Sequence, residues 1–319
     1  MKTIGVLTSG GDSPGMNACI RAITRTAIKN NLKVVGIMRG YQGLIDGEFV
    51  ELTARFVGNI LQLGGTVLKT SRSAEFKTKA GFEKALENIK KAKIDVLFVI
   101  GGDGSFNGAL SLAKAGVKVI AIPASIDNDL KYTDYTIGFD TAVNTIVSLV
   151  NNIRDTSMAH ERITVVEVMG AYCGDIALNA GVASGADYIL VPEVKFEPKK
   201  LYEKLMINNK NGKLCNIIVA NENVMSSEKL AKEITKNTGL EVRFANVGHI
   251  QRGGSPTAND RIRATMFGIH AVSEMMQGKY NFAVGVRAEK VMSVPIERAF
   301  DKYREFDKSL YDMIMEISY

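Results

Sequence analysis

The chain has few of the side chains that most often bind transition metals or form disulfide bonds. It contains three histidines and three cysteines, Cys19, Cys173 and Cys215, and the cysteines form no Cys-x-x-Cys pair. This scarcity argues against a zinc site, a disulfide framework and a metal site built from several histidines.

Long apolar runs and targeting segments are also missing. Unbroken apolar stretches such as Val96–Ile100 are short, whereas a membrane-spanning helix needs about 20 apolar residues. The first residues, MKTIGVLTSGGD, hold too short an apolar stretch for a signal peptide. We therefore expect a cytoplasmic location.

Charge and size are those of an ordinary globular protein. The 319 residues are 46% hydrophobic, which is enough for two domains with substantial cores. The net charge of +6 is spread along the chain, and its densest basic stretch, residues 83–93, is typical of a solvated helix face. Spread positive charge suits small anionic ligands better than nucleic acid.

The pattern of apolar residues predicts an α/β fold. Apolar strands alternate with amphipathic helices, which is typical of a parallel sheet covered on both faces. In the first half we expect strands at 3–9, 33–38, 94–100 and 117–123, and helices at 15–30, 81–93 and 105–116.

The same alternation begins again after residue 140 and predicts a second lobe. Ser255 is expected to cap the last helix, with Pro256 in its first turn. No linker rich in Pro, Gly or Ser separates the lobes. The expected strands are 162–169, 186–193, 216–222 and 244–250, and the expected helices are 141–157, 175–184 and 255–277.

Polar loops follow four of the predicted strands. Because ligands of parallel sheets bind at the carboxyl ends of strands, these loops are candidates for a site. They are SGGDSPG (9–15), GGDGS (101–105), ASIDND (124–129) and GHIQRGG (248–254).

The first loop contains a literal G-x-S-x-G, the pattern of a hydrolase nucleophile elbow. The residue after Ser13 is Pro14, which has no backbone N–H to donate to an oxyanion, so the hydrolase interpretation fails. A glycine turn facing an anion at a helix N-terminus fits better. The loop matches neither the P-loop nor the dinucleotide-binding pattern.

The second and third loops carry carboxylates. Three glycines around Asp103 indicate close approach of a phosphate, with Asp103 near Mg²⁺. NAD kinases and lipid kinases also contain GGDG. Asp127 and Asp129 flank Asn128; they are either turn residues or a base for phosphoryl transfer with a second carboxylate beside it.

Cationic residues near the fourth loop suggest a sugar-phosphate clamp. His249 and Arg252 lie in this loop, and Arg243 lies six residues before His249. Arginine binds phosphate with charge-assisted hydrogen bonds. Arg162, at a strand start, is a similar candidate. A buried histidine and a surface arginine are the structural alternatives.

Taken together, the motifs resemble the bacterial 6-phosphofructokinases that use ATP. The resemblance extends from about residue 3 to about residue 300 and implies a Mg²⁺-dependent kinase that converts fructose 6-phosphate to fructose 1,6-bisphosphate, the committed step of glycolysis. It also implies a homotetramer with active sites shared between subunits. The motifs are TSGGDSPGMNA, GGDGS, IDNDL, YTIGFDTA, VVEVMG, YCGD and GHIQRGGSP, in this order.

The resemblance further implies two lobes and a set of roles. The larger, ATP-binding lobe would be 1–138 plus 252–304, and the smaller, fructose 6-phosphate-binding lobe 139–251 plus 305–319. Asp127 would be the catalytic base, helped by Arg72, and Asp103 would hold Mg²⁺.

The implied ATP site consists of Gly11, Arg72, Ser73, Gly102, Asp103, Gly104 and Ser105. The implied fructose 6-phosphate site consists of Ser125, Ile126, Asp127, Arg162, Met169, Gly170, Ala171, Glu222, Arg243, His249 and Arg252. Of these, Arg162 and Arg243 would reach the 6-phosphate from a neighbouring subunit.

Two positions bear on the phosphate donor. The pyrophosphate-using branch of the family typically has Asp at the position of Gly104 and Lys at that of Ala124, so the small residues here favour ATP. Ala171 stands where Arg is usual, and Ser125 where Thr is usual. A phosphotransferase with another donor or sugar phosphate, and a low-activity nucleotide-binding regulatory paralogue, are the alternatives.

The resemblance also implies an effector site for ADP or phosphoenolpyruvate. Ala54 and Asn211 occupy positions that are usually basic, and Asp187 stands where Glu is usual, which weakens this expectation. The implied effector-site residues are Arg21, Arg25, Arg154, Gly185, Asp187 and Lys213, and of these Arg21, Arg25, Arg154 and Lys213 match the usual basic residues.

Overall fold

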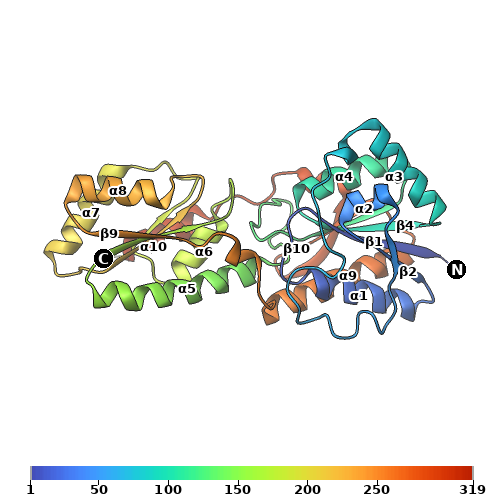
Figure 1. Cartoon of the computed structure of the whole chain (residues 1–319), viewed down its shortest axis with the longest axis horizontal. Coiled ribbons are helices and arrows are strands. Elements are labelled where there is room, and N and C mark those ends of the chain that lie inside the picture. The colour runs from blue at the N-terminus through green and yellow to red at the C-terminus, as the bar shows by residue number, and fades with distance from the viewer. Residues whose placement is uncertain (1, 318–319) are drawn as a thin grey trace. The chain divides into compact units, whose positions relative to one another are not determined.

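The computed structural model describes residues 2–317 and divides them into two compact units (Figure 1). Unit 1 comprises the described residues up to Ile126, Leu130–Thr141 and Arg252–Arg304. Unit 2 comprises Asp127–Asp129, Ala142–Gln251 and the residues from Glu305 onward. The α/β class, with two mostly parallel sheets, is confirmed.

Unit 1 is built on a seven-stranded sheet in the order β11-β10-β5-β4-β1-β2-β3. The inner strands are parallel, and β3 and β11 pair antiparallel at the two edges. All of β4 is buried, as expected for a strand covered on both faces. The strands are β1 (Thr3–Ser9), β2 (Lys33–Ile37), β3 (Phe49–Glu51), β4 (Val96–Gly101), β5 (Val119–Pro123), β10 (Phe282–Arg287) and β11 (Lys290–Pro295).

Helices cover both faces of this sheet (Figure 1). One core joins the sheet to α1 and α9, and a second core joins its other face to α2, α3 and α4. The helices are α1 (Met16–Lys29), α2 (Gly40–Asp46), α3 (Lys79–Lys91), α4 (Asp103–Lys114) and α9 (Ala258–Met276), with short 3-10 turns at Glu75–Lys77 and Ile296–Phe300.

Unit 2 is built on a four-stranded parallel sheet in the order β7-β8-β6-β9. Leucines of α7 and α8 pack on one face of the sheet. The strands are β6 (Ile163–Val168), β7 (Tyr188–Leu190), β8 (Asn216–Asn221) and β9 (Val242–Asn246). The helices are α5 (Phe139–Ala159), which starts in unit 1, α6 (Asp175–Ala183), α7 (Pro198–Lys210), α8 (Ser227–Thr238), α10 (Lys308–Ile317) and a 3-10 turn at Gly248–Arg252.

Two predicted strands are too long. The strand expected at 244–250 ends at Asn246, because Gly248 has a φ of 53° and begins the 3-10 turn. The strand expected at 186–193 is reduced to Tyr188–Leu190, and a turn follows in which Val194 N–H donates to the Val191 carbonyl (3.3 Å).

The predicted cap of the last long helix is wrong. The helix starts at Ala258, and Thr257 is its N-cap, whose Oγ1 accepts a hydrogen bond from Asp260 N–H (3.3 Å). Ser255 instead donates through Oγ to the Gln62 carbonyl (2.7 Å). Ser and Thr are both good N-cap residues, so the sequence alone does not distinguish Ser255 from Thr257 as the cap. The hydrogen bond of Ser255 to Gln62 leaves Thr257 as the cap.

The β10–β11 hairpin is absent from the prediction. Its two-residue turn, Ala288-Glu289, has φ values of 46° and 62°. Such turns usually contain Asn or Gly, so the sequence here lacks the usual signal. Within residues 2–317, no helix is long and apolar enough to cross a membrane.

Asp260 joins the two segments by which the chain leaves unit 1 and returns to it. Its fully buried carboxylate accepts hydrogen bonds from Tyr135 Oη (2.8 Å), Gly138 N (2.6 Å) and both Thr141 N (2.8 Å) and Oγ1 (2.5 Å). Burial raises the pKa of Asp260, while these donors oppose that rise by favouring its charged form.

Asp260→Asn should destabilise unit 1. The amide nitrogen cannot accept, so two of the four donors lose their partner at a cost of about 3 kcal/mol. Urea unfolding should show this loss. Glu289→Gln, which removes the exposed partner of Arg263 on the helix that carries Asp260, is the control and should change stability by less than about 0.5 kcal/mol. Equal effects of the two variants would contradict the prediction.

Candidate functional site

Two glycine loops lie side by side at the carboxyl ends of β1 and β4. The strands are parallel neighbours with Ser9 opposite Gly101. A Cβ added to Gly10 would lie 3.3 Å from Ser105 Oγ. Each loop leads into a helix, α1 or α4, whose first N–H groups can bind an anion.

The glycines of the second loop serve different purposes. A Cβ on Gly101 would lie 2.5 Å from the Ser9 carbonyl oxygen, so the fold itself requires glycine there. A Cβ on Gly102 would come no closer than 3.7 Å to Ser125, and one on Gly104 would have no atom within 4 Å. The fold has room for side chains at these two positions, and open space beside a helix N-terminus suits a phosphate.

Asp103 is the first residue of α4 and is exposed. Its Oδ2 accepts a hydrogen bond from Asn107 Nδ2 (3.1 Å). Among the described residues, no three His, Cys, Asp or Glu side chains gather as a metal site. A single exposed carboxylate beside the open space at Gly102 and Gly104 fits Mg²⁺, which is commonly bound by one or two carboxylates together with substrate phosphates and water.

Ser105 is almost fully buried beneath the same loop. Its Oγ has no hydrogen-bond partner within residues 2–317. Its carbonyl oxygen accepts a hydrogen bond from Tyr41 Oη (2.6 Å), and burial raises the pKa of Tyr41, so this phenol stays protonated as a donor. The Tyr41 ring stacks on Phe76 with centroids 4.2 Å apart.

Arg252 lies over the first glycine loop. Its Nη2 donates to the Asp12 carbonyl (3.1 Å), and its Nε is 3.5 Å from Asp12 Oδ1. A side chain on Gly11 would overlap the guanidinium group. The structure therefore brings together Arg252, expected to bind sugar phosphate, and Gly11, expected to bind nucleotide.

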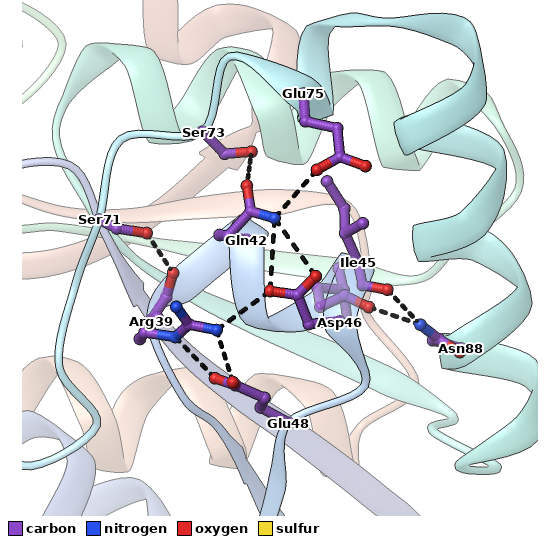
Figure 2. A network of polar contacts seen from close by, with 10 residues as sticks. Arg39, Gln42, Ile45, Asp46, Glu48, Ser71, Ser73, Glu75 and Asn88 are labelled. Atoms are coloured by element: carbon purple, nitrogen blue, oxygen red, sulfur yellow. Dashed lines mark hydrogen bonds and ion pairs between the residues drawn. The ribbon is translucent and has the colours of Figure 1, made fainter.

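The segment that carries Arg72 is held on both sides (Figure 2). Ser71 Oγ donates to the Arg39 carbonyl (2.9 Å), and Ser73 Oγ donates to Gln42 Oε1 (2.8 Å). Gln42 in turn donates to Glu75 Oε2 (3.1 Å). The Arg72 side chain is exposed, so the network fixes its backbone and leaves its charge accessible.

The carboxylate loop Asp127–Asp129 belongs to unit 2, although it follows a strand of unit 1. Before it, the Ser125 carbonyl accepts a hydrogen bond from Thr136 Oγ1 (2.5 Å), and both residues, like Ile126, are in unit 1. At the centre of the loop, Asn128 has a left-handed φ of 53°, and its Nδ2 donates to Asp175 Oδ2 (2.9 Å).

Four predicted sugar-binding residues gather after β6 and β8. Met169 N–H donates to Gln251 Oε1 (3.1 Å), next to Arg252. Gly170 has a φ of 134°, and Ala171 N–H donates to Glu222 Oε1 (3.2 Å). His249 is exposed in the adjoining 3-10 turn, Gly248–Arg252.

Arg162 and Arg243 lie at the other end of the same sheet. Arg162 directly precedes β6, and Arg243 is opposite Thr164 on the neighbouring strand. Met169 is seven positions after Arg162, a span of about 20 Å in a strand. Arg162 Nη2 donates to Thr156 Oγ1 (3.3 Å), and Arg243 pairs with exposed Glu241 (2.9 Å).

Most of the predicted effector residues lie in unit 2. Arg154 Nη2 donates to the carbonyls of Ser184 (2.5 Å) and Gly185 (2.9 Å), and Lys213 Nζ pairs with Asp187 Oδ1 (2.5 Å). Asp187 Oδ2 also accepts from Ile217 N–H (2.7 Å). The remaining two, Arg21 and Arg25, are four residues apart on α1 of unit 1.

Three polar residues in this region are absent from the sequence prediction. Asp175, Asn221 and Gln251 are buried, and each holds the backbone or side chain of a predicted site residue or its neighbour. Asp175 and Gln251 lie within the motifs YCGD and GHIQRGG, but a motif does not distinguish a residue that contacts ligand from one that supports it.

The whole chain is similar in sequence to proteins of one family. The family model described as Phosphofructokinase matches residues 3–275. The chain is 50% identical over 319 residues to an ATP-dependent 6-phosphofructokinase of Clostridium novyi, and 50% identical over 318 residues to an ATP-dependent 6-phosphofructokinase 1 of Clostridium perfringens; each alignment covers 100% of both proteins.

Solved structures agree with this match. Phosphofructokinase from Saccharomyces cerevisiae superposes with a TM-score of 0.92 at 32% identity, covering 100% of this chain and 50% of the yeast chain. A pyrophosphate-dependent phosphofructokinase from Marinobacter aquaeolei superposes with a TM-score of 0.86 at 20% identity, covering 100% of this chain and 91% of the other. That second likeness concerns the fold alone.

Substitution of single glycines should separate those that the fold requires from those that it does not. Gly101→Ala should lower stability by roughly 1–3 kcal/mol, because its Cβ would overlap the Ser9 carbonyl. Gly104→Ala, the matched control in the same loop, should change stability by less than about 1 kcal/mol, because alanine suits the first helical turn. Thermal unfolding measures both. A larger loss for Gly104→Ala would contradict the proposed open space.

Proposed function

The chain belongs to the phosphofructokinase family, and from this premise we propose which residues carry its reaction. The activity itself is ATP-dependent 6-phosphofructokinase activity: a phosphoryl group passes from ATP to fructose 6-phosphate, giving fructose 1,6-bisphosphate and ADP, in glycolysis. The observation that carries this conclusion is the 50% identity over the whole length of relatives with that activity. We propose a cytoplasmic location on the same basis.

Unit 1 is the proposed ATP-binding part. The phosphates would lie against Gly11 and the loop Gly102–Ser105, where Gly102 and Gly104 have room beside them. Arg72, with Ser73 beside it, would add positive charge near the transferred group. Mg²⁺, held by Asp103, would supply neutralisation of phosphate charge. Gly104 and Ala124 support ATP rather than pyrophosphate as donor.

Unit 2 is the proposed main sugar-binding part and also carries the base. Asp127 would accept the proton of the 1-hydroxyl group as its oxygen forms a bond to the γ-phosphorus and the bond to ADP breaks. Glu222 is bonded to the segment that contains Met169 and Gly170, through the Ala171 N–H and the Val168 carbonyl, which supports a shared role of these residues in holding the sugar. In unit 1, Ser125 and Ile126 precede Asp127, and Arg252 would stabilise charge in the transition state.

A coupled assay of fructose 1,6-bisphosphate formation tests this assignment. Asp127→Asn should lower kcat by at least about 100-fold with little change in the KM for fructose 6-phosphate, because a general base acts in the transition state. Asp312→Asn, which changes an exposed carboxylate paired with Lys308, is the control and should keep kcat. A near-normal kcat for Asp127→Asn would remove Asp127 from the mechanism.

The same assay addresses the two alternatives. Turnover with pyrophosphate and none with ATP would indicate another donor, and another sugar phosphate can replace fructose 6-phosphate in the assay. ATP binding without turnover would favour a regulatory paralogue, the possibility raised by Ala171.

We also propose a homotetramer whose active sites are shared between subunits. Arg162 and Arg243 support it, because both lie at the end of the unit 2 sheet away from the proposed sugar-binding loop of their own chain, and Arg162 is about 20 Å along the strand from Met169. A stripe of exposed apolar side chains along one face of α9 offers a surface for another subunit. The stripe consists of Ile262, Met266, Ile269 and Met276.

ADP and phosphoenolpyruvate are the proposed effectors. Arg154, Lys213, Arg21 and Arg25 would supply the positive charge. Asp187 neutralises part of it through Lys213, and Ala54 and Asn211 supply none, so we expect weak activation by ADP.

Mixed oligomers test the shared site. Arg243→Ala should raise the KM for fructose 6-phosphate, because it removes a charge-assisted phosphate contact worth about 1.5–3 kcal/mol. Mixing Arg243→Ala chains with Asp127→Asn chains should restore activity, since some sites then receive intact residues from both. Mixing each variant with itself is the control. Verified hybrids without rescue would place both residues in the site of one chain.

A further inference from the structure

Asn128 lies at the centre of the loop that carries the proposed base, and its backbone is unusual. Its φ of 53° is in the left-handed region, which Asn tolerates better than most residues but which still costs energy. Only 3% of Asn128 is exposed, so solvent does not compensate for that cost. Contacts within the protein must hold it.

Asp175 supplies the side-chain contact. Its Oδ2 accepts a hydrogen bond from Asn128 Nδ2 (2.9 Å), and Asp175 is only 4% exposed. It is the first residue of α6, where the helix dipole and the first N–H groups favour a negative charge. The carboxylate is therefore well placed to accept the hydrogen bond from the Asn128 amide.

Cys173 and Asn221 add a contact to the Asn128 backbone. Cys173 Sγ is 3.9 Å from the Asn128 carbonyl oxygen, a weak contact. Asn221, fully buried at the end of β8, donates through Nδ2 to the Cys173 carbonyl (3.1 Å). The loop is thus tied at its side chain and at its carbonyl to the segment that follows the sugar-binding residues Met169 and Gly170.

We infer that Asp175 is a positioning residue for the catalytic base, acting through Asn128. By holding Asn128 in its left-handed conformation, it sets the direction in which the neighbouring Asp127 carboxylate points. It also keeps that carboxylate fixed relative to the sugar-binding loop of unit 2. This inference rests on the proposed role of Asp127 as base.

The kinetic consequence is specific. A base displaced by a fraction of an ångström still leaves sugar binding intact, because Met169 and Ala171 are held by Gln251 and Glu222. Asp175→Asn, which keeps the shape and removes the charge, should lower kcat on the order of tenfold. The KM for fructose 6-phosphate should change by less than about threefold, since the lost interaction acts in the transition state.

A double-mutant cycle separates positioning from a general effect on stability. Asn128→Gly removes the side chain and permits the left-handed backbone without strain. If Asp175 acts through Asn128, adding Asp175→Asn to Asn128→Gly should lower kcat no further. Asn179→Ala is the matched control: it removes a hydrogen bond to the Asp175 carbonyl (2.8 Å) without touching Asn128, and it should keep kcat.

The outcomes are distinct. Unchanged kcat in Asp175→Asn, independent losses in the double mutant, or an equal loss in Asn179→Ala would overturn the inference. Should Asp175→Asn fail to fold, Asn128→Ala carries the same test, because it removes the tether and keeps the strain; normal kcat there would also overturn it. Asp127→Asn is measured in parallel. If it keeps kcat, the proposed base is wrong, whereas its loss together with an inert Asp175 would reject only the present inference.

Discussion

The four hydrogen bonds to Asp260 are the constraint on which the organisation of this chain depends. Unit 1 is discontinuous: the chain leaves it after Thr141 and returns at Arg252. Asp260 accepts from the outgoing segment at Tyr135, Gly138 and Thr141. Thr257 adds two bonds to the same segment, through its N–H to Thr141 Oγ1 (3.0 Å) and its Oγ1 to Asp140 Oδ2 (2.5 Å). These bonds therefore keep the two parts of unit 1 joined, although more than one hundred residues of unit 2 lie between them in the chain.

That closure also explains why α9 can complete the core of unit 1. The helix packs along α1 on one face of the seven-stranded sheet, with Phe267 and Ala271 in the same core as Ile20 and Ile23. Gly268 permits this approach, since a Cβ there would lie 2.8 Å from Ala22 Cβ. Unit 2 has its own sheet and core, and it contains both the proposed sugar-binding loop and the proposed base.

The sequence predicted the layered α/β class because buried strands and amphipathic helices have strong local patterns. It did not reveal the β10–β11 hairpin, whose turn lacks glycine, or the helix cap at Thr257, which depends on a distant contact of Ser255 with Gln62. The carboxylate loop shows the same limit. Its sequence position after β5 assigns it to unit 1, but the contact between Asn128 and Asp175, 47 residues apart, makes it part of unit 2.

The backbone contacts of Ala171 distinguish between two roles that an arginine at this position could have. The arginine that the family resemblance leads us to expect at this position would serve either to supply charge or to set the conformation of the loop. Here the loop is set without it: Ala171 has a φ of 49° and donates its N–H to Glu222, while Met169 donates to Gln251. Glu222 is in turn held by its N–H bond to the Val168 carbonyl (2.9 Å). The conformation thus depends on backbone donors that an arginine at position 171 would also provide, so the expected arginine would differ from Ala171 mainly in its positive charge.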